Sequence, residues 1–305
     1  MIYVPTVFKR AVRRWLGRPD GAVRVVEPAH AGRGAVTLLD DPAYEVIPGP
    51  AVDQAIDALP PRSLVTVTCS PRGRIEATLD VAGRLAQAGH RVVPHLAARL
   101  VRDDMVPEIA AALAAHRISD VFVIAGDAPE ALGPYQGALG LIPDLLAAAP
   151  HIRRVGVAGY PEGHPLLDAA ELRRQLLAKQ ALLRAASVDG WVSTQMCFDP
   201  LRIATWLEQE RAAGLTLPVR LGVPGLVDRA RLLRIGARLG VGASLRFASK
   251  QGGTIARLIA PGGFDPLHVI RPLGRDAARL GIERLHVFTF NSVAETVAWR
   301  ERLLR

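Results

Sequence analysis

Short β-branched runs alternate with longer amphipathic segments along most of the chain, beginning near Ala43. This alternation is typical of a parallel sheet whose strands are joined by crossover helices. The pattern predicts eight strands, at residues 44–47, 64–68, 91–95, 121–125, 154–159, 190–194, 219–223 and 285–289. Helices are predicted between them, at residues 77–88, 106–116, 168–186, 201–213 and 229–239.

Eight such units on one chain favour a closed (β/α)8 TIM barrel over residues 41–305. An open doubly wound sheet is the alternative, because the number of strands does not prove closure. The absence of a Gly-x-Gly-x-x-Gly sequence after the first predicted strand weakens a dinucleotide-binding Rossmann interpretation.

Two segments depart from the alternation. Residues 1–40 form a basic N-terminal extension, in which residues 7–18 predict an amphipathic helix with three Arg opposite its apolar face. Such a helix either packs over one end of the barrel or contacts an acidic membrane surface or a partner. Residues 243–266 predict a long loop between the last two strands, and loops of this length are usually functional.

Composition narrows the class of protein. Half of the 305 residues are hydrophobic, which is enough for a large core, and the formal charge of +9 comes from an Arg-rich composition without aromatic-interleaved basic stretches. We therefore predict no nucleic-acid binding. No apolar run reaches the roughly 20 residues of a membrane span, and no signal sequence is evident, so we predict a cytoplasmic protein without integral membrane association. The sequence leaves the oligomeric state open, a homo-oligomer included.

Candidate chemistry gathers where the predicted strands end, which is where (β/α)8 barrels carry their reacting groups. The polar residues at these ends are Glu45, Thr68, His95, Asp127, Tyr160, Glu162, His164 and Gln195. Cys69 and Ser70 lie in no nucleophile motif. The histidines and carboxylates have no paired metal-ligand spacing, so we predict no metal site.

These strand ends resemble the methylenetetrahydrofolate reductase family. The motifs YEVIP (44–48), AGD (125–127), AGYPEGHP (158–165), STQMCFD (193–199) and HVFTFN (286–291) follow the order of that family, with VTVT, VVPHL and GVPG between them. YPEGHP and TQMCFD are the most specific, and the matches extend over nearly all of residues 43–305.

The resemblance implies a barrel that binds FAD, with NADH or NADPH and a tetrahydrofolate derivative taking turns at the flavin. Glu45 is then the general acid that assists opening of the bridged folate, and such a carboxyl should lie in a partly dry pocket that favours its protonated form. Asp127 would stabilise the cationic folate beside the flavin, and the amide of Gln195 would hydrogen-bond the pterin. The resemblance places cofactor contacts at Thr68, His95, Gly126, Asp127, Tyr135, Tyr160 and His164.

The chain also departs from that family. Ala125 stands where an Arg commonly precedes the Gly-Asp pair, which removes a bidentate donor for a pyrophosphate. The helix after YPEGHP is altered as well, leaving Lys179 or Arg184 as the phosphate partner. Two alternatives therefore stand beside the FAD enzyme: direct hydride transfer from the nicotinamide to the folate, and a folate-binding or regulatory barrel without redox activity.

Overall fold

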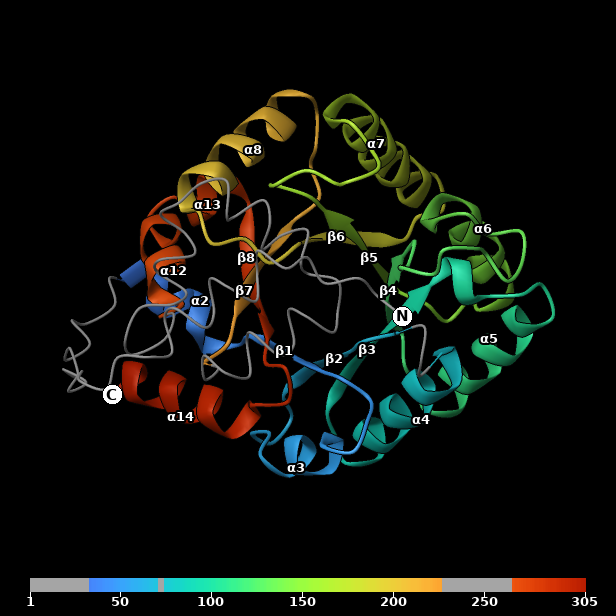
Figure 1. Ribbon diagram of the computed structural model, residues 1–305, viewed down its shortest axis with the longest axis horizontal. Coiled ribbons are helices and arrows are strands. Elements are labelled where there is room, and N and C mark those ends of the chain that lie inside the picture. Colours follow the sequence, from blue (N-terminus) through green and yellow to red (C-terminus); the bar gives the residue numbers. More distant parts are fainter. Residues whose placement is uncertain (1–32, 71–73, 227–264) are drawn as a thin grey trace, which may run out of the picture.

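Eight parallel strands close into a barrel in the order β1 to β8, with helices around the outside (Figure 1). The computed structural model describes residues 33–70, 74–226 and 265–305. The first and last strands are paired, with Ala43 opposite His286, so the sheet has no open edge. The prediction of a (β/α)8 barrel is confirmed, and the doubly wound alternative is excluded.

Each predicted strand has its counterpart. The strands are β1 (Ala43–Val46), β2 (Leu64–Val67), β3 (Arg91–Ala97), β4 (Asp120–Ile124), β5 (Arg154–Gly159), β6 (Asp189–Thr194), β7 (Val219–Pro224) and β8 (Ile282–Phe288). The largest differences in bounds are at β3, which continues two residues further, and at β8, which begins three residues earlier.

The helices form the outer layer. Four match predicted segments: α4 (Arg74–Gln87), α5 (Met105–Ala115), α7 (Ala169–Ala185) and α8 (Pro200–Ala212). The others are α2 (Arg33–Asp40), α3 (Val52–Asp57), the 3-10 turn η1 (Ala98–Leu100), α6 (Ala138–Ala148), α12 (Leu267–Gly274), α13 (Ala277–Leu280) and α14 (Val293–Leu304). The predicted helices at 7–18 and 229–239, and nearly all of the predicted loop at 243–266, lie outside the described residues. No helix in the described ranges combines the length and apolarity that crossing a membrane requires.

Helix α2 belongs to the outer layer of the barrel. It lies against α12, β8 and α14, and Leu38 and Leu39 are buried in the core. We predicted residues 1–40 as a basic N-terminal extension, and its last eight residues, Arg33–Asp40, form one of the helices that cover the barrel.

Side chains on alternate positions of the strands fill the barrel interior. Five of them form one apolar cluster: Ala43, Leu64, Val93, Phe122 and Trp191. Gly156 on β5 leaves the room that two of these rings occupy, since a Cβ at this position would lie 2.3 Å from the indole of Trp191 and 2.6 Å from Phe122.

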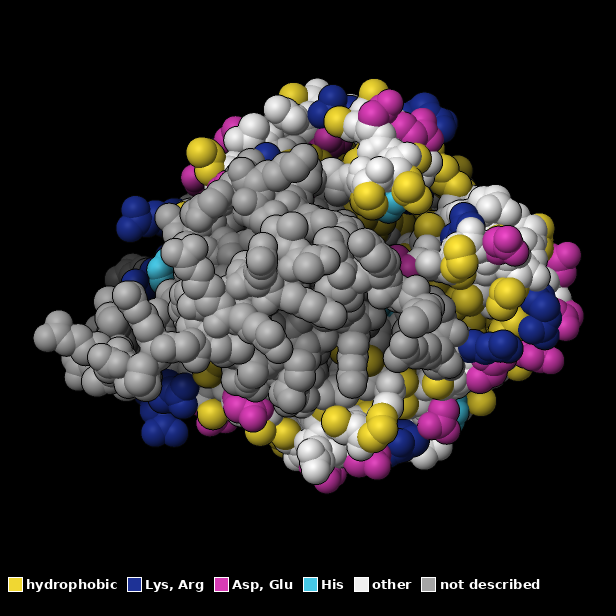
Figure 2. Space-filling model, in the orientation of Figure 1, with side chains coloured by type: hydrophobic (Ala, Val, Ile, Leu, Met, Phe, Trp, Pro, Cys, Tyr) yellow, Lys and Arg dark blue, Asp and Glu magenta, His cyan; other side chains and the backbone are white. Residues whose placement is uncertain are grey.

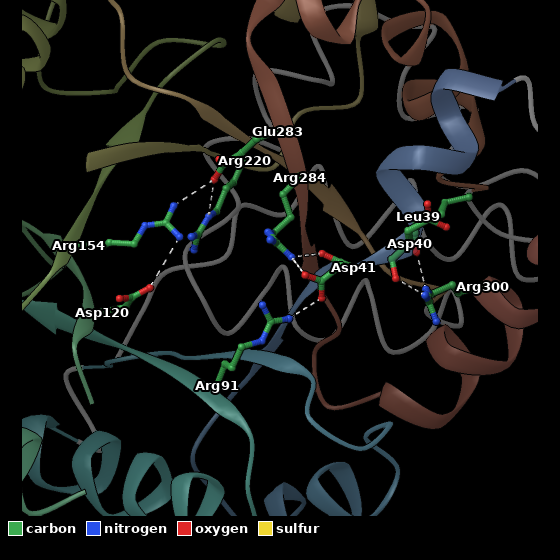
Figure 3. Close-up of polar contacts among 10 residues, drawn as sticks. All are labelled: Leu39, Asp40, Asp41, Arg91, Asp120, Arg154, Arg220, Glu283, Arg284 and Arg300. Carbon is green, nitrogen blue, oxygen red and sulfur yellow. Dashed lines mark hydrogen bonds and ion pairs between the residues drawn. The ribbon is translucent and has the colours of Figure 1, made fainter. Parts of the chain in front are cut away.

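Ion pairs close the end of the barrel at which the strands begin (Figure 3). Asp41, just before β1, accepts hydrogen bonds from Arg91 and Arg284, the first at 2.6 Å. Arg220 is 1% exposed, lies 3.8 Å over the ring of Trp191 and pairs with Glu283 at 3.2 Å. Burial lowers the pKa of Arg220 to about 10. The charged groups at this end are paired with one another. In (β/α)8 barrels the reacting groups lie at the opposite end, where the strands finish.

Charges of both signs lie on the described part of the face in view. Figure 2 shows acidic and basic side chains interspersed on the described surface around α4, α5 and α7.

Candidate functional site

A buried carboxyl and imidazole form a pair where the first and last strands meet. Glu45 on β1 is 5% exposed and His286 on β8 is 2% exposed. Oε2 of Glu45 lies 2.9 Å from Nε2 of His286, which is a hydrogen bond. Glu45 shares the inward face of β1 with Ala43, two residues earlier, so the pair lies inside the barrel.

A second histidine lies beside this pair. His95 on β3 is 5% exposed, and its ring lies 4.8 Å from Phe122 and 6.0 Å from His286. Its Nε2 has no hydrogen-bond partner within the described part of the chain. Burial, and then the charge of His286, hold the pKa of His95 well below its ordinary value of 6.5. His95 is therefore a neutral imidazole near pH 7.

The three residues are close enough to test as a metal site. One donor atom each from Glu45, His95 and His286 lie within 4.8 Å of one another. A first-row ion takes nitrogen and oxygen ligands at roughly 2.0–2.2 Å. Here the facing atoms of Glu45 and His286 already bind each other, and the geometry is that of a hydrogen-bonded acid and imidazole with a second imidazole beside them.

The turn after β8 fastens the end of β1. The hydroxyl of Thr289 donates to the backbone carbonyl of Glu45. The side-chain amide of Asn291 accepts from the backbone N–H of Ile47 and donates to its carbonyl, each at 2.8 Å. Phe290 and Asn291 have φ of 50° and 62°, a conformation that costs free energy for non-glycine residues and persists where surrounding contacts fix it. These contacts fix the position of Glu45 from the backbone as well as from the side chain.

A cavity of about 1200 Å³ opens beyond the ends of β4 and β5, between α6, α7 and α8. Five of the predicted site residues line it: Gly126, Asp127, Tyr160, His164 and Lys179. Gly126 has a φ of 87°, and a Cβ there would lie 2.8 Å from the Cβ of Ala97. Glycine at this position therefore lets the loop after β4 pack closely on the end of β3.

Asp127 sets the electrostatics of one wall of the cavity. Burial, and then the charge of Asp127, raise the pKa of Tyr160. Burial lowers the pKa of His164, and Asp127 partly opposes that shift. The rings of Tyr160 and His164 meet edge to face at 5.2 Å. An exposed carboxylate thus lies beside two ring side chains that are mostly uncharged near neutral pH.

The cations of the cavity differ in what they already bind. The guanidinium of Arg99 donates to the carbonyls of Ala128 and Pro129. Arg173 pairs at 3.0 Å with Glu210, which is 3% exposed. Lys179 makes no ion pair with any described residue, and burial lowers its pKa.

Lys179 is therefore a cation of this cavity whose charge no described ion pair neutralises, and Arg202 also lines the cavity. Arg184, the other predicted phosphate partner, is exposed near the end of α7 and does not line the cavity.

Three further predicted residues lie apart from the cavity lining. Thr68 follows β2, and its hydroxyl oxygen is buried without a partner among the described residues. Gln195 ties the ends of two strands together, because its backbone N–H donates to the carbonyl of Gly159 at 2.8 Å. Tyr135 is 6% exposed, and its hydroxyl donates to Asp144 on α6 at 2.7 Å. Burial and this hydrogen bond raise the pKa of Tyr135 to about 12.

The structure thus places Glu45 and His95 together inside the barrel and five other predicted residues around the cavity, while Thr68, Tyr135 and Gln195 are not part of the cavity lining. Sequence reasoning missed two residues. His286 lies within a predicted strand rather than at its end, and only barrel closure brings it to Glu45. Arg99 lies in η1, where no recognised motif marks it.

Comparisons with known proteins agree with this fold. A family profile described as methylenetetrahydrofolate reductase matches residues 53–238. Methylenetetrahydrofolate reductase 2 of Saccharomyces cerevisiae is 34% identical over 80 residues, which are 26% of this chain and 13% of the yeast protein. An uncharacterised protein from Clostridium thermocellum that binds two copies of 5-methyl-5,6,7,8-tetrahydrofolic acid has a similar structure. Its TM-score is 0.53 at 9% identity, over 84% of this chain and 94% of that one, a similarity of fold alone.

Proposed function

Because the chain belongs to the methylenetetrahydrofolate reductase family, we propose that it interconverts 5,10-methylenetetrahydrofolate and 5-methyltetrahydrofolate with a nicotinamide cofactor. The observation that carries the proposal is the buried carboxyl of Glu45, bonded to His286 at the end of β1. A carboxyl held at the end of a barrel strand is placed to deliver a proton to a substrate.

The reaction requires a proton and a hydride. Opening the bridged ring of the folate breaks a carbon–nitrogen bond, and the departing nitrogen takes a proton, which Glu45 supplies. The methylene carbon then accepts the hydride and becomes the methyl group, while NADH or NADPH is oxidised. Asp127 stabilises the cation formed on ring opening, and Gln195 hydrogen-bonds the pterin. These roles follow from the resemblance. The position of Asp127 at the cavity is consistent with its role in stabilising the cation.

The cavity suits a large cofactor. Its volume of about 1200 Å³ exceeds the roughly 300–1,000 Å³ typical of drug-sized ligands. Gly126, Tyr160, His164 and Lys179 would hold FAD or the nicotinamide cofactor, with Lys179 on a phosphate. FAD, when bound, supplies a flavin ring that accepts hydride from the nicotinamide and passes it on.

The alternative route passes hydride directly from the nicotinamide to the folate. Two features favour it: Ala125 contributes no donor, and Arg99 is already engaged with backbone carbonyls. An absorption spectrum of the undenatured protein separates the routes. Flavin bands would support FAD, whereas a colourless protein that oxidises NADH or NADPH only with folate would support direct transfer.

The test of function compares wild-type protein with Glu45→Gln. We expect turnover to fall at least about 100-fold, because general acid catalysis contributes about 10²–10⁴, while the Kd for 5-methyltetrahydrofolate stays within about threefold. Glu108→Gln, on the exposed face of α5, is the matched control and should turn over normally. Wild-type protein that binds and turns over neither folate would refute the proposal.

A folate-binding barrel without redox activity is the second candidate. The fold of the Clostridium thermocellum protein, which binds 5-methyl-5,6,7,8-tetrahydrofolic acid, favours it. The engagement of Arg99 and Arg173 with other groups of the described structure also favours it. It predicts tight folate binding by wild-type protein with no nicotinamide oxidation, with or without added FAD.

A further inference from the structure

We infer that β8 and the turn after it, through Asn291, form the positioning apparatus of Glu45, with His286 as the hydrogen-bond donor to its carboxylate. The role of Glu45 as an acid rests on the proposed function, whereas the positioning rests on contacts in the structure. His286, Thr289 and Asn291 are assigned here as positioning residues, because each acts through β1.

Contacts from three side chains converge on the end of β1. The Nε2 of His286 meets the carboxyl of Glu45 at 2.9 Å, Thr289 binds its carbonyl, and Asn291 binds both polar backbone groups of Ile47. The carboxyl is thus held on its side chain, at its own backbone and two residues further on. A reacting group must be held to within roughly 0.5 Å of its productive geometry, and this requires such support.

A donor is needed once the proton has left. After transfer, Glu45 is a carboxylate in the dry interior of the barrel, where an unpaired charge is very costly. An imidazole that donates through Nε2–H stabilises that carboxylate. Among the described residues, His286 is the one whose side chain hydrogen-bonds the carboxyl of Glu45.

The other groups around the pair make no described hydrogen bond to the carboxyl of Glu45. From β3, His95 faces it, but its ring centroid is 6.0 Å away from that of His286 and its Nε2 has no partner among described residues. From β2, Thr66 is buried opposite Glu45, also with an unpartnered hydroxyl in the described structure. Phe122 and Phe288 pack as apolar neighbours. His95 and His286 are therefore the titratable neighbours of Glu45 that the structure describes.

The choice of substitutions at position 286 depends on which ring nitrogen makes the contact. Because Nε2 of His286 makes the contact, a glutamine amide reaches about the same position, whereas the shorter amide of asparagine and the side chain of leucine do not. We expect His286→Leu to lower kcat about 10- to 100-fold, the effect of losing a hydrogen bond to a charged group. KM for folate should change less than threefold, and His286→Gln should recover at least half of the wild-type kcat. His268→Leu, on an exposed position of α12, is the matched control.

Two results would overturn the inference. One is wild-type kcat in His286→Leu, and the other is His286→Gln as impaired as His286→Leu while both remain folded by circular dichroism. If His286→Leu does not fold, His286→Asn replaces it with the same expectations. A metal ion retained stoichiometrically by the purified protein and lost in His286→Leu would also overturn it, because the carboxyl would then be a ligand.

A measurement independent of turnover separates this inference from the proposed function. The infrared carboxyl bands of Glu45, assigned by difference against Glu45→Gln, should shift in His286→Leu and stay near their wild-type frequency in His286→Gln. If wild-type protein turns over no folate, the proposed function fails, and the infrared result still decides the hydrogen bond. Bands unchanged in His286→Leu would refute the positioning role even in an active enzyme.

Discussion

The neutral histidine beside the acid should make the folding stability of this protein depend on pH. Burial holds the pKa of His95 well below 6.5 in the folded protein. In the unfolded chain His95 is exposed to water, and its imidazole has the ordinary pKa of about 6.5. Below this pH the unfolded state holds more protons than the folded state, so stability is present at high pH and is lost as the pH falls through 6.5.

The size of the effect follows from one proton. If the folded state leaves His95 unprotonated throughout, its contribution falls by RT ln(1 + 10^(6.5 − pH)). This amounts to about 2 kcal/mol between pH 7.5 and pH 5.0. His90 and His164, whose pKa values burial also lowers, add losses in the same direction. The total alone therefore does not identify His95.

Comparison with His95→Gln isolates the contribution of His95. Urea unfolding at pH 7.5 and 5.0, followed by tryptophan fluorescence and far-ultraviolet circular dichroism, gives free energies where the two probes coincide. Wild-type protein should lose up to about 2 kcal/mol more than His95→Gln over this range. His90→Gln is the matched control and should remove a smaller part, because His90 is only half-buried. Equal losses in wild type and His95→Gln would refute the reasoning.

Three further predictions concern packing and binding. Gly156→Ala should lower the free energy of unfolding by about 1–3 kcal/mol, because its Cβ meets the interior indole at 2.3 Å; an unchanged urea midpoint would contradict this. Lys179→Met should weaken binding of the phosphate-bearing cofactor about 10- to 100-fold by titration calorimetry, whereas Arg184→Met on the same helix leaves it unchanged. Tyr135→Phe should cost about 0.5–1.5 kcal/mol of stability through the lost bond to Asp144 with no change in cofactor Kd, and a weakened Kd would show that the hydroxyl contributes to cofactor binding.

Periodicity predicted the strands because each one is a short β-branched run bounded by polar turns. Periodicity predicted the helices less completely. The segment that forms α6 contains Gly140 and Pro143, two residues that local propensity counts against a helix, and packing overrides that preference.

The candidate site was predicted in the same uneven way. Glu45 and His95 could be found because polar residues interrupt apolar strands near their ends. His286 could not, since nothing local distinguishes an inward His from an outward one, and its partner is 241 positions away. The separate cavity around Lys179 also needed the fold, because its walls come from three helices.

The seam between the first and last strands has a consequence for how the protein is made. Glu45 is synthesised well before its partners, because His286 follows it by 241 positions and Thr289 and Asn291 come later still. During synthesis the carboxyl therefore has none of these partners until the eighth strand of the barrel has been made. Such a long-range contact is slow to form, because the entropy of closing the whole loop must be lost first. Assembly of the acid site is thus a late event that coincides with closure of the barrel, and a chain truncated before residue 286 would contain the acid without the apparatus that holds it.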